Sequence, residues 1–212
     1  MKELDLKGIS YLRAFEGTSE WYYALDYAGG DLYEAQEIYE TGRTLLGSHF
    51  FLVHYPDGEV INPLPPRENV SIGEPVYFDG KISFLAVDFA AGKIGIFRFD
   101  CASREVEEVD TIRLSSVTDC FNLKLTEHPL TLTRQPNNGT LELIWPKKIT
   151  ISIDEKESYF FREENKLYFS TWYEDPDYRV ETVIRDADTG EILEKVSGDM
   201  QIMPNGEIWH VK

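Results

Sequence analysis

Three eight-residue stretches decide the fold: Leu25–Leu32 (LDYAGGDL), Val53–Val60 (VHYPDGEV) and Val87–Ile94 (VDFAAGKI). They share one pattern, which is an apolar residue, Asp or His, an aromatic residue, two turn residues, Gly, a polar residue and an apolar residue. Glycine tolerates the positive φ that a tight turn between antiparallel strands needs. The repeat therefore predicts three antiparallel hairpins of one type.

The second half of this pattern recurs three more times in the chain, at Asn138–Leu141, Thr189–Ile192 and Asn205–Ile208. Strand-like runs flank these glycines, and Thr150–Ile153 alternates polar and apolar residues as a half-buried strand does. The sequence thus predicts an all-β fold built from a succession of antiparallel hairpins.

Many short hairpins in sequence are typical of a propeller, a barrel or a sandwich. With about four strands and 40 to 50 residues in a blade, the chain has room for four to five blades. It resembles β-propeller proteins in architecture only, because the WD and kelch signatures are absent. We predict one all-β domain over residues 1–212, a small irregular β-propeller, with a β-sandwich or open barrel as the alternative. A strand over 9–15 is expected to pair with one over 207–211.

One segment, Asp31–Glu40, fits two structures. Asp31 is a suitable N-cap with Glu34 as its capping-box partner and Gly42 as a helix stop, which favours a short helix. The match to the other two repeats instead favours a strand that pairs with residues 21–27. The repeat carries more weight, so a strand is the expectation.

The charge of the chain limits its partners. Asp and Glu total 38 against 21 Lys and Arg, which gives a formal net charge of −17. Such a surface repels phosphate backbones and anionic lipids, so neither nucleic acid nor a membrane is expected as a partner. The N-terminal stretch Met1–Lys7 lacks the apolar run of a signal peptide, and a cytoplasmic location is expected. No phosphate-binding glycine loop precedes a helix, and no cofactor is expected.

The densest group of chemically active side chains lies in Trp172–Arg179, between two predicted strands. Flat aromatic faces beside carboxylates suit a glycan, and paired carboxylates suit glycoside hydrolysis. The predicted ligand-binding residues are Trp172, Tyr173, Tyr178 and Arg179, and the candidate catalytic residues are Glu174, Asp175 and Asp177. The alternative is a connecting loop centred on Pro176, whose acidic side chains are simply in water.

A second candidate site comes from the Asp or His position of the repeat, which is Asp26, His54 and Asp88. If these positions converge, two carboxylates and an imidazole could hold a divalent cation. Asp before a tight turn also accepts hydrogen bonds from turn amides, so a purely structural role is the alternative.

No catalytic signature stands out in the chain, and a binding or interaction module is therefore preferred to an enzyme. The ligand is an unknown small molecule, glycan or protein. A carbohydrate-active hydrolase and a divalent-cation-binding β protein are the two alternatives. The stretch Asn165–Arg179 also resembles a family of uncharacterised bacterial proteins, a resemblance that implies no activity.

Overall fold

The computed structural model describes residues 1–27 and 29–212; Ala28, which belongs to the first repeat of the sequence, lies outside the described residues. The chain forms two compact units. Unit 1 holds Met1–Cys120 with Pro204–Gly206, and unit 2 holds Phe121–Met203 with Glu207–Lys212. That residues 1–212 act as a single domain stays a prediction.

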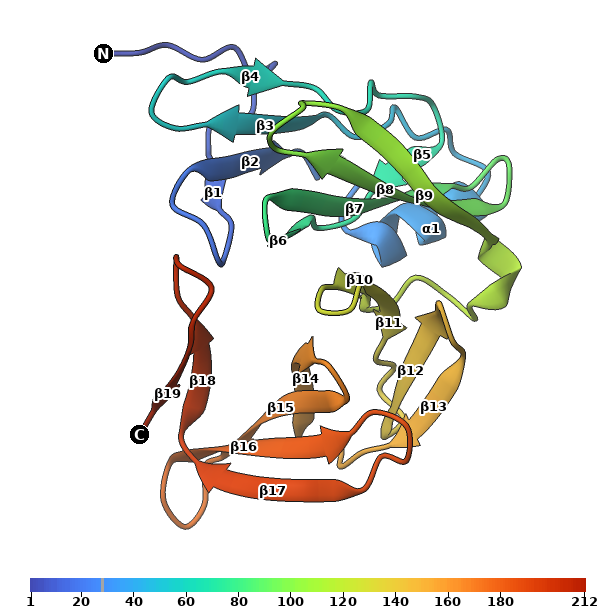
Figure 1. The fold of residues 1–212 in the computed structure, drawn as a ribbon. Coiled ribbons are helices and arrows are strands. Elements are labelled where there is room, and N and C mark those ends of the chain that lie inside the picture. Colours follow the sequence, from blue (N-terminus) through green and yellow to red (C-terminus); the bar gives the residue numbers. More distant parts are fainter. Residues whose placement is uncertain (28) are drawn as a thin grey trace. The chain divides into compact units, whose positions relative to one another are not determined.

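Unit 1 contains two antiparallel sheets and one α-helix (Figure 1). The first sheet has the order β1-β2-β3-β4, from Arg13–Ala14, Trp21–Leu25, Phe50–His54 and Val60–Ile61. The helix α1, Leu32–Glu40, lies between β2 and β3 in the chain. The second sheet has the order β5-β7-β8-β9, from Val70–Ile72, Lys81–Asp88, Lys93–Asp100 and Val106–Arg113. Strand β6, Val76–Phe78, also pairs with β7, and a 3-10 turn, Leu114–Ser116, follows β9.

Unit 2 contains two four-stranded antiparallel sheets and one further hairpin. The sheet β10-β11-β12-β13 comes from Leu123–Thr126, Thr131–Arg134, Thr140–Trp145 and Ile149–Ser152. The sheet β14-β15-β16-β17 comes from Glu157–Glu163, Lys166–Tyr173, Arg179–Asp186 and Ile192–Ser197. The hairpin pairs β18, Asp199–Ile202, with β19, Ile208–Val211.

These sheets confirm the all-β prediction and the succession of antiparallel hairpins. Three of the four sheets follow chain order from one edge to the other, and the fourth departs from it only where β5 and β6 both pair with β7. Four or five antiparallel strands in such an order are the blades of a β-propeller. The predicted propeller architecture is thus confirmed with four blades.

Five of the six predicted glycine turns close hairpins. Their glycines all have positive φ: Gly58 (76°), Gly92 (64°), Gly139 (72°), Gly190 (75°) and Gly206 (83°). In the turn that joins β3 to β4, the Gly58 N–H donates to the His54 carbonyl at 2.8 Å and the His54 N–H donates to the Glu59 carbonyl at 3.0 Å. This pair of bonds sets the register of the two strands.

The prediction of a strand over Asp31–Glu40 is wrong, and the first repeat does not form a hairpin. The segment is the helix α1, and its capping box is complete. Asp31 Oδ1 accepts the N–H groups of Tyr33 and Glu34, each at 2.9 Å, and Glu34 Oε2 accepts the Asp31 N–H at 2.9 Å. Leu32 and Ala35 are buried, so the helix also has an apolar side to pack. Strand β2 pairs with β1 and β3 instead.

The predicted pairing of residues 9–15 with 207–211 is also wrong for the described residues. Within residues 9–15, the strand β1 consists of Arg13–Ala14 and pairs with β2. Strand β19 pairs with β18.

A buried ion pair supports unit 2 next to its apolar core. Arg185 on β16 donates from Nε and Nη2 to the two carboxylate oxygens of Glu157, both at 2.9 Å, and from Nη1 to the Gly190 carbonyl at 2.7 Å. Glu157 is only 2% exposed. Such a bidentate, fully hydrogen-bonded pair holds a planar geometry, and it joins β14 to the turn between β16 and β17.

Within the described part of the chain, no helix has the length and apolar character needed to cross a membrane.

The hairpin turns provide a direct test of the fold. Gly92→Val should lower the free energy of unfolding by about 1 to 3 kcal/mol, because a β-branched residue is strained at positive φ. An added Cβ at Gly92 meets no atom within 4 Å, so the loss is expected to come mainly from backbone strain. Gly92→Asn is the matched control, since Asn tolerates this conformation. In urea denaturation, an equal loss for both variants would contradict the argument.

The helix cap provides a second test. Asp31→Ala should cost about 1 kcal/mol of unfolding free energy because it removes the acceptor for two backbone N–H groups. Asp31→Asn keeps a side-chain oxygen and should cost much less. Urea denaturation followed by circular dichroism measures both. If Asp31→Ala and Asp31→Asn are equally stable, the cap does not hold this helix.

Candidate functional site

Two large aromatic side chains face solvent where β15 ends and the chain connects to β16. We call Trp172–Arg179, which includes this connection and the strand ends on either side of it, the aromatic loop. Trp172 is 50% exposed and Tyr178 is 73% exposed. Their rings contact edge to face, with centroids 6.2 Å apart at an interplanar angle of 75°. Large apolar groups that face water together are a common sign of a binding surface.

Two cationic side chains contact the ring of Tyr173, the residue that follows Trp172. The Arg179 guanidinium is 4.1 Å from the Tyr173 ring centroid, and Lys156 Nζ is 5.2 Å from the same centroid. Arg179 Nε also donates to Glu181 Oε1 at 3.4 Å. The Tyr173 ring thus holds two cations through its π face. The four predicted ligand-binding residues lie at one end of this strand pair: Trp172 and Tyr173 end β15, Tyr178 is in the connection, and Arg179 begins β16, where it pairs with Tyr173.

The three candidate catalytic carboxylates Glu174, Asp175 and Asp177 all lie exposed in the aromatic loop. The Asp175–Pro176 peptide bond is cis. A glycosidase needs one carboxyl group kept protonated by an apolar, partly dry environment. The exposed carboxylate oxygens of these residues are accessible acceptors for hydrogen bonds.

The three predicted metal-ligating residues each have a separate partner. Asp26 Oδ2 is bonded to His49 Nδ1 at 2.8 Å. Asp88 Oδ1 accepts the Ala91 N–H at 2.8 Å, and Asp88 Oδ2 lies 3.6 Å from Arg67 Nη2. Asp88 therefore caps its turn, as the structural alternative predicts.

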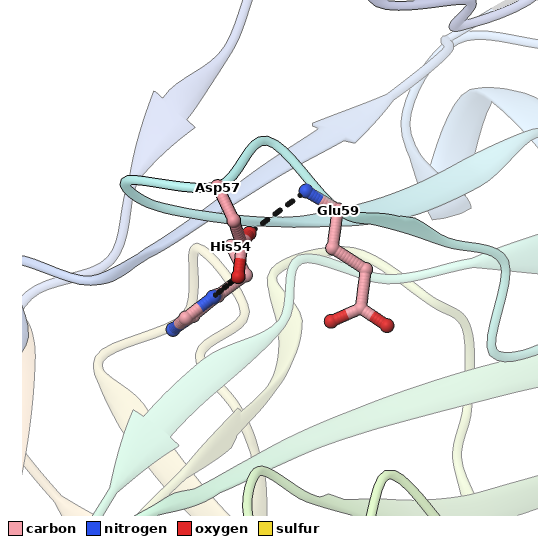
Figure 2. A group of neighbouring side chains, drawn as sticks. All are labelled: His54, Asp57 and Glu59. Atoms are coloured by element: carbon pink, nitrogen blue, oxygen red, sulfur yellow. Dashed lines mark hydrogen bonds and ion pairs between the residues drawn. The ribbon is translucent and has the colours of Figure 1, made fainter.

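His54 belongs to a different cluster, which the sequence reasoning missed. Its Nδ1 is bonded to Asp57 Oδ2 at 2.8 Å, and Asp57 Oδ1 accepts the Glu59 N–H at 2.9 Å. Figure 2 shows the three side chains on one hairpin. One ligand atom from each of His54, Asp57 and Glu59 lies within 4.8 Å of the other two, and no other such group of three occurs among the described residues. The spacing His-x-x-Asp-x-Glu within one predicted turn was the available signal.

Comparison with known proteins leaves the chain without an assigned family. No protein-family profile matches it, and no curated protein matches its sequence. Among solved structures it is similar to Porphyromonas gingivalis dipeptidyl peptidase 4, at 10% identity and a TM-score of 0.45 over 95% of this chain and 33% of that one. It is also similar to Pyrococcus horikoshii acylaminoacyl peptidase, at 10% identity and a TM-score of 0.47 over 94% of this chain and 35% of that one.

A third similar structure is a puromycin-hydrolysing peptidase of Mycobacterium tuberculosis, at 11% identity and a TM-score of 0.44, which covers 92% of this chain and 30% of that one. The chain thus spans about a third of the length of these proteins. Likenesses this distant carry no conclusion about activity.

Proposed function

We propose that this protein is a binding module and that the aromatic loop contacts its ligand. The observation that carries the proposal is the pair of exposed rings, Trp172 and Tyr178, held edge to face on a β-sheet connection. Leaving two such rings in water has a cost in free energy that a ligand would recover. Loops on a rigid sheet are also where binding residues concentrate.

A glycan is the ligand class that this chemistry suits best. A sugar ring presents apolar C–H faces, which stack on aromatic rings, and hydroxyl groups, which donate to carboxylates. The loop supplies both: the rings of Trp172 and Tyr178, and the exposed carboxylates of Glu174, Asp175 and Asp177. A small molecule or a protein segment with the same combination of groups is the alternative ligand.

The hydrolase alternative has less support than binding. The three loop carboxylates are exposed, which suits hydrogen bonding to hydroxyl groups better than proton transfer to a glycosidic oxygen. We therefore keep Glu174, Asp175 and Asp177 as ligand-contacting residues. The exclusion of nucleic acid and membrane partners stays a prediction, supported by the net charge of −17. The cytoplasmic location also stays a prediction, which rests on the N-terminal stretch Met1–Lys7.

Binding to soluble oligosaccharides tests the proposal. A panel of neutral and basic oligosaccharides is titrated into the full chain, and affinity is followed by calorimetry. Trp172→Ala and Tyr178→Ala should each weaken binding about tenfold or more, as loss of an aromatic anchor does. Both side chains are largely exposed, so the variants should stay folded.

Trp209→Ala is the matched control for this experiment. Trp209 is 54% exposed and lies on β19, outside the aromatic loop. Its removal should leave the affinity unchanged. Equal loss of binding in all three variants, or no binding to any member of the panel, would contradict the glycan proposal.

A further inference from the structure

The hairpin between β3 and β4 gathers three metal-ligating groups within six residues. Strand β3 ends at His54 and strand β4 begins at Val60. The turn has Asp57 at its tip and Glu59 on the returning chain, directly bonded through its carbonyl to the His54 N–H at 3.0 Å. His54 and Glu59 are therefore neighbours across the mouth of the hairpin. Figure 2 shows their side chains projecting to the same side as that of Asp57.

The His54 imidazole is held in place before any ligand arrives. His54 pairs across the sheet with Trp21, and the two ring centroids are 4.9 Å apart. Trp21 is only 3% exposed, so it is a rigid support. The His54 side chain itself is 19% exposed, which leaves its edge open to water. A ligating side chain that is already fixed loses less conformational entropy when it binds a metal ion.

Both carboxylates are already oriented by neighbouring groups. Asp57 Oδ2 is bonded to His54 Nδ1 at 2.8 Å, and Asp57 Oδ1 accepts the Glu59 N–H at 2.9 Å. Glu59 Oε2 lies 3.3 Å from Arg104 Nη2, and the Arg104 guanidinium in turn lies 4.5 Å from the Trp21 ring centroid. Outer groups that hydrogen-bond a ligating carboxylate commonly orient it in metal sites.

The backbone oxygens of the turn are used elsewhere. Lys2 Nζ donates to the carbonyls of Pro56 and Asp57, at 2.6 Å and 2.5 Å. The groups offered to an ion are thus one imidazole nitrogen and two carboxylates. Calcium prefers six to eight oxygen ligands, whereas Zn²⁺ accepts a mixed set of three protein ligands with water in the fourth position.

We propose that His54, Asp57 and Glu59 bind a divalent metal cation, and Zn²⁺ fits this set of ligand atoms best. Ligands about 2.0 to 2.2 Å from a tetrahedral zinc lie roughly 3.4 Å from one another. The three groups already lie within 4.8 Å of each other, so a small rotation of the exposed side chains closes the site. The cation takes the place of the proton between His54 Nδ1 and Asp57 Oδ2, and the imidazole then carries its proton on Nε2. This cation site does not depend on the aromatic loop.

The third repeat supplies a natural comparison. Its hairpin has the same pattern but carries Asp88, Ala91 and Lys93 at the positions of His54, Asp57 and Glu59. One of its three potential ligands is a methyl group and another is a cation. The hairpin with the same sequence pattern therefore lacks the donor set, and Asp88→Asn serves as the control variant.

Titration with Zn²⁺ alone tests the site. Calorimetry on the full chain should show one Zn²⁺ bound per chain, and the melting temperature should rise with Zn²⁺ because the ion binds only the folded hairpin. Asp57→Asn and Glu59→Gln should each weaken binding at least tenfold, since each removes one of three ligands. Asp57→Asn keeps an oxygen to accept the Glu59 N–H, so the hairpin should persist. Asp88→Asn should bind as the unaltered chain does.

Co²⁺ gives a readout that reports the ligands directly. The visible absorption of four-coordinate Co²⁺ should appear with the unaltered chain and with Asp88→Asn, and should be lost with Asp57→Asn. Three results would overturn the proposal: no Zn²⁺ binding at millimolar concentration, Zn²⁺ binding that is equal in all variants, or saturable binding of Ca²⁺ in place of Zn²⁺.

Discussion

The structure depends on one backbone constraint, which is the tight turn that reverses a strand through a glycine at positive φ. In this turn the residue that ends the first strand accepts the N–H of the glycine four positions later, as His54 does from Gly58 and Asp186 from Gly190. Glycine adopts that conformation without the strain that most other residues incur. Each such turn sets the register of its two strands, and the register decides which side chains reach the core. The blades are built by repetition of this step.

The same turn takes on different chemistry according to the side chains at three positions. In the turn after β7, Asp88 Oδ1 accepts the Ala91 N–H, and the Ala91 side chain is a methyl group with no polar atom. In the turn after β3, the equivalent positions are His54 and Asp57, and they bond to each other. The two turns share a sequence pattern and a glycine at positive φ, and they differ in the side chains at these positions and in the cis Tyr55–Pro56 peptide bond of the first.

The aromatic loop shows the opposite arrangement. Strands β15 and β16 are paired from Lys166 with Asp186 to Tyr173 with Arg179, and the connection beyond Tyr173 contains no glycine. The five residues 174–178 connect the two strands. The rings of Tyr178, in this connection, and of Trp172, at the end of β15, face water. The paired strands β15 and β16 fix the position of the loop, so its side chains are not required for the stability of the sheet. Binding residues concentrate on such connections for this reason.

Local chemistry was readable from the sequence wherever neighbouring residues alone decide the conformation. The glycine turns at Gly58, Gly92, Gly139, Gly190 and Gly206 were predicted correctly, and with them the all-β class and the blade-type sheets. The capping box of α1 was also visible, but the repeat pattern outweighed it wrongly. The tertiary structure decided between strand and helix for this segment. Strand β2 pairs with β3, so Asp31–Glu40 is not needed as its partner and forms a helix.

Tertiary structure likewise decided which polar groups meet. The repeat suggested Asp26, His54 and Asp88 as one set, yet each has its own partner. Equivalent positions in a repeat share a backbone environment, and nothing in that equivalence brings them near one another. The side chains that do gather, His54, Asp57 and Glu59, lie within one turn. The sequence by itself determined five of the six glycine hairpin turns, because a positive φ is favoured by a single residue type. Which side chains share a site depends on distances that only the folded chain defines.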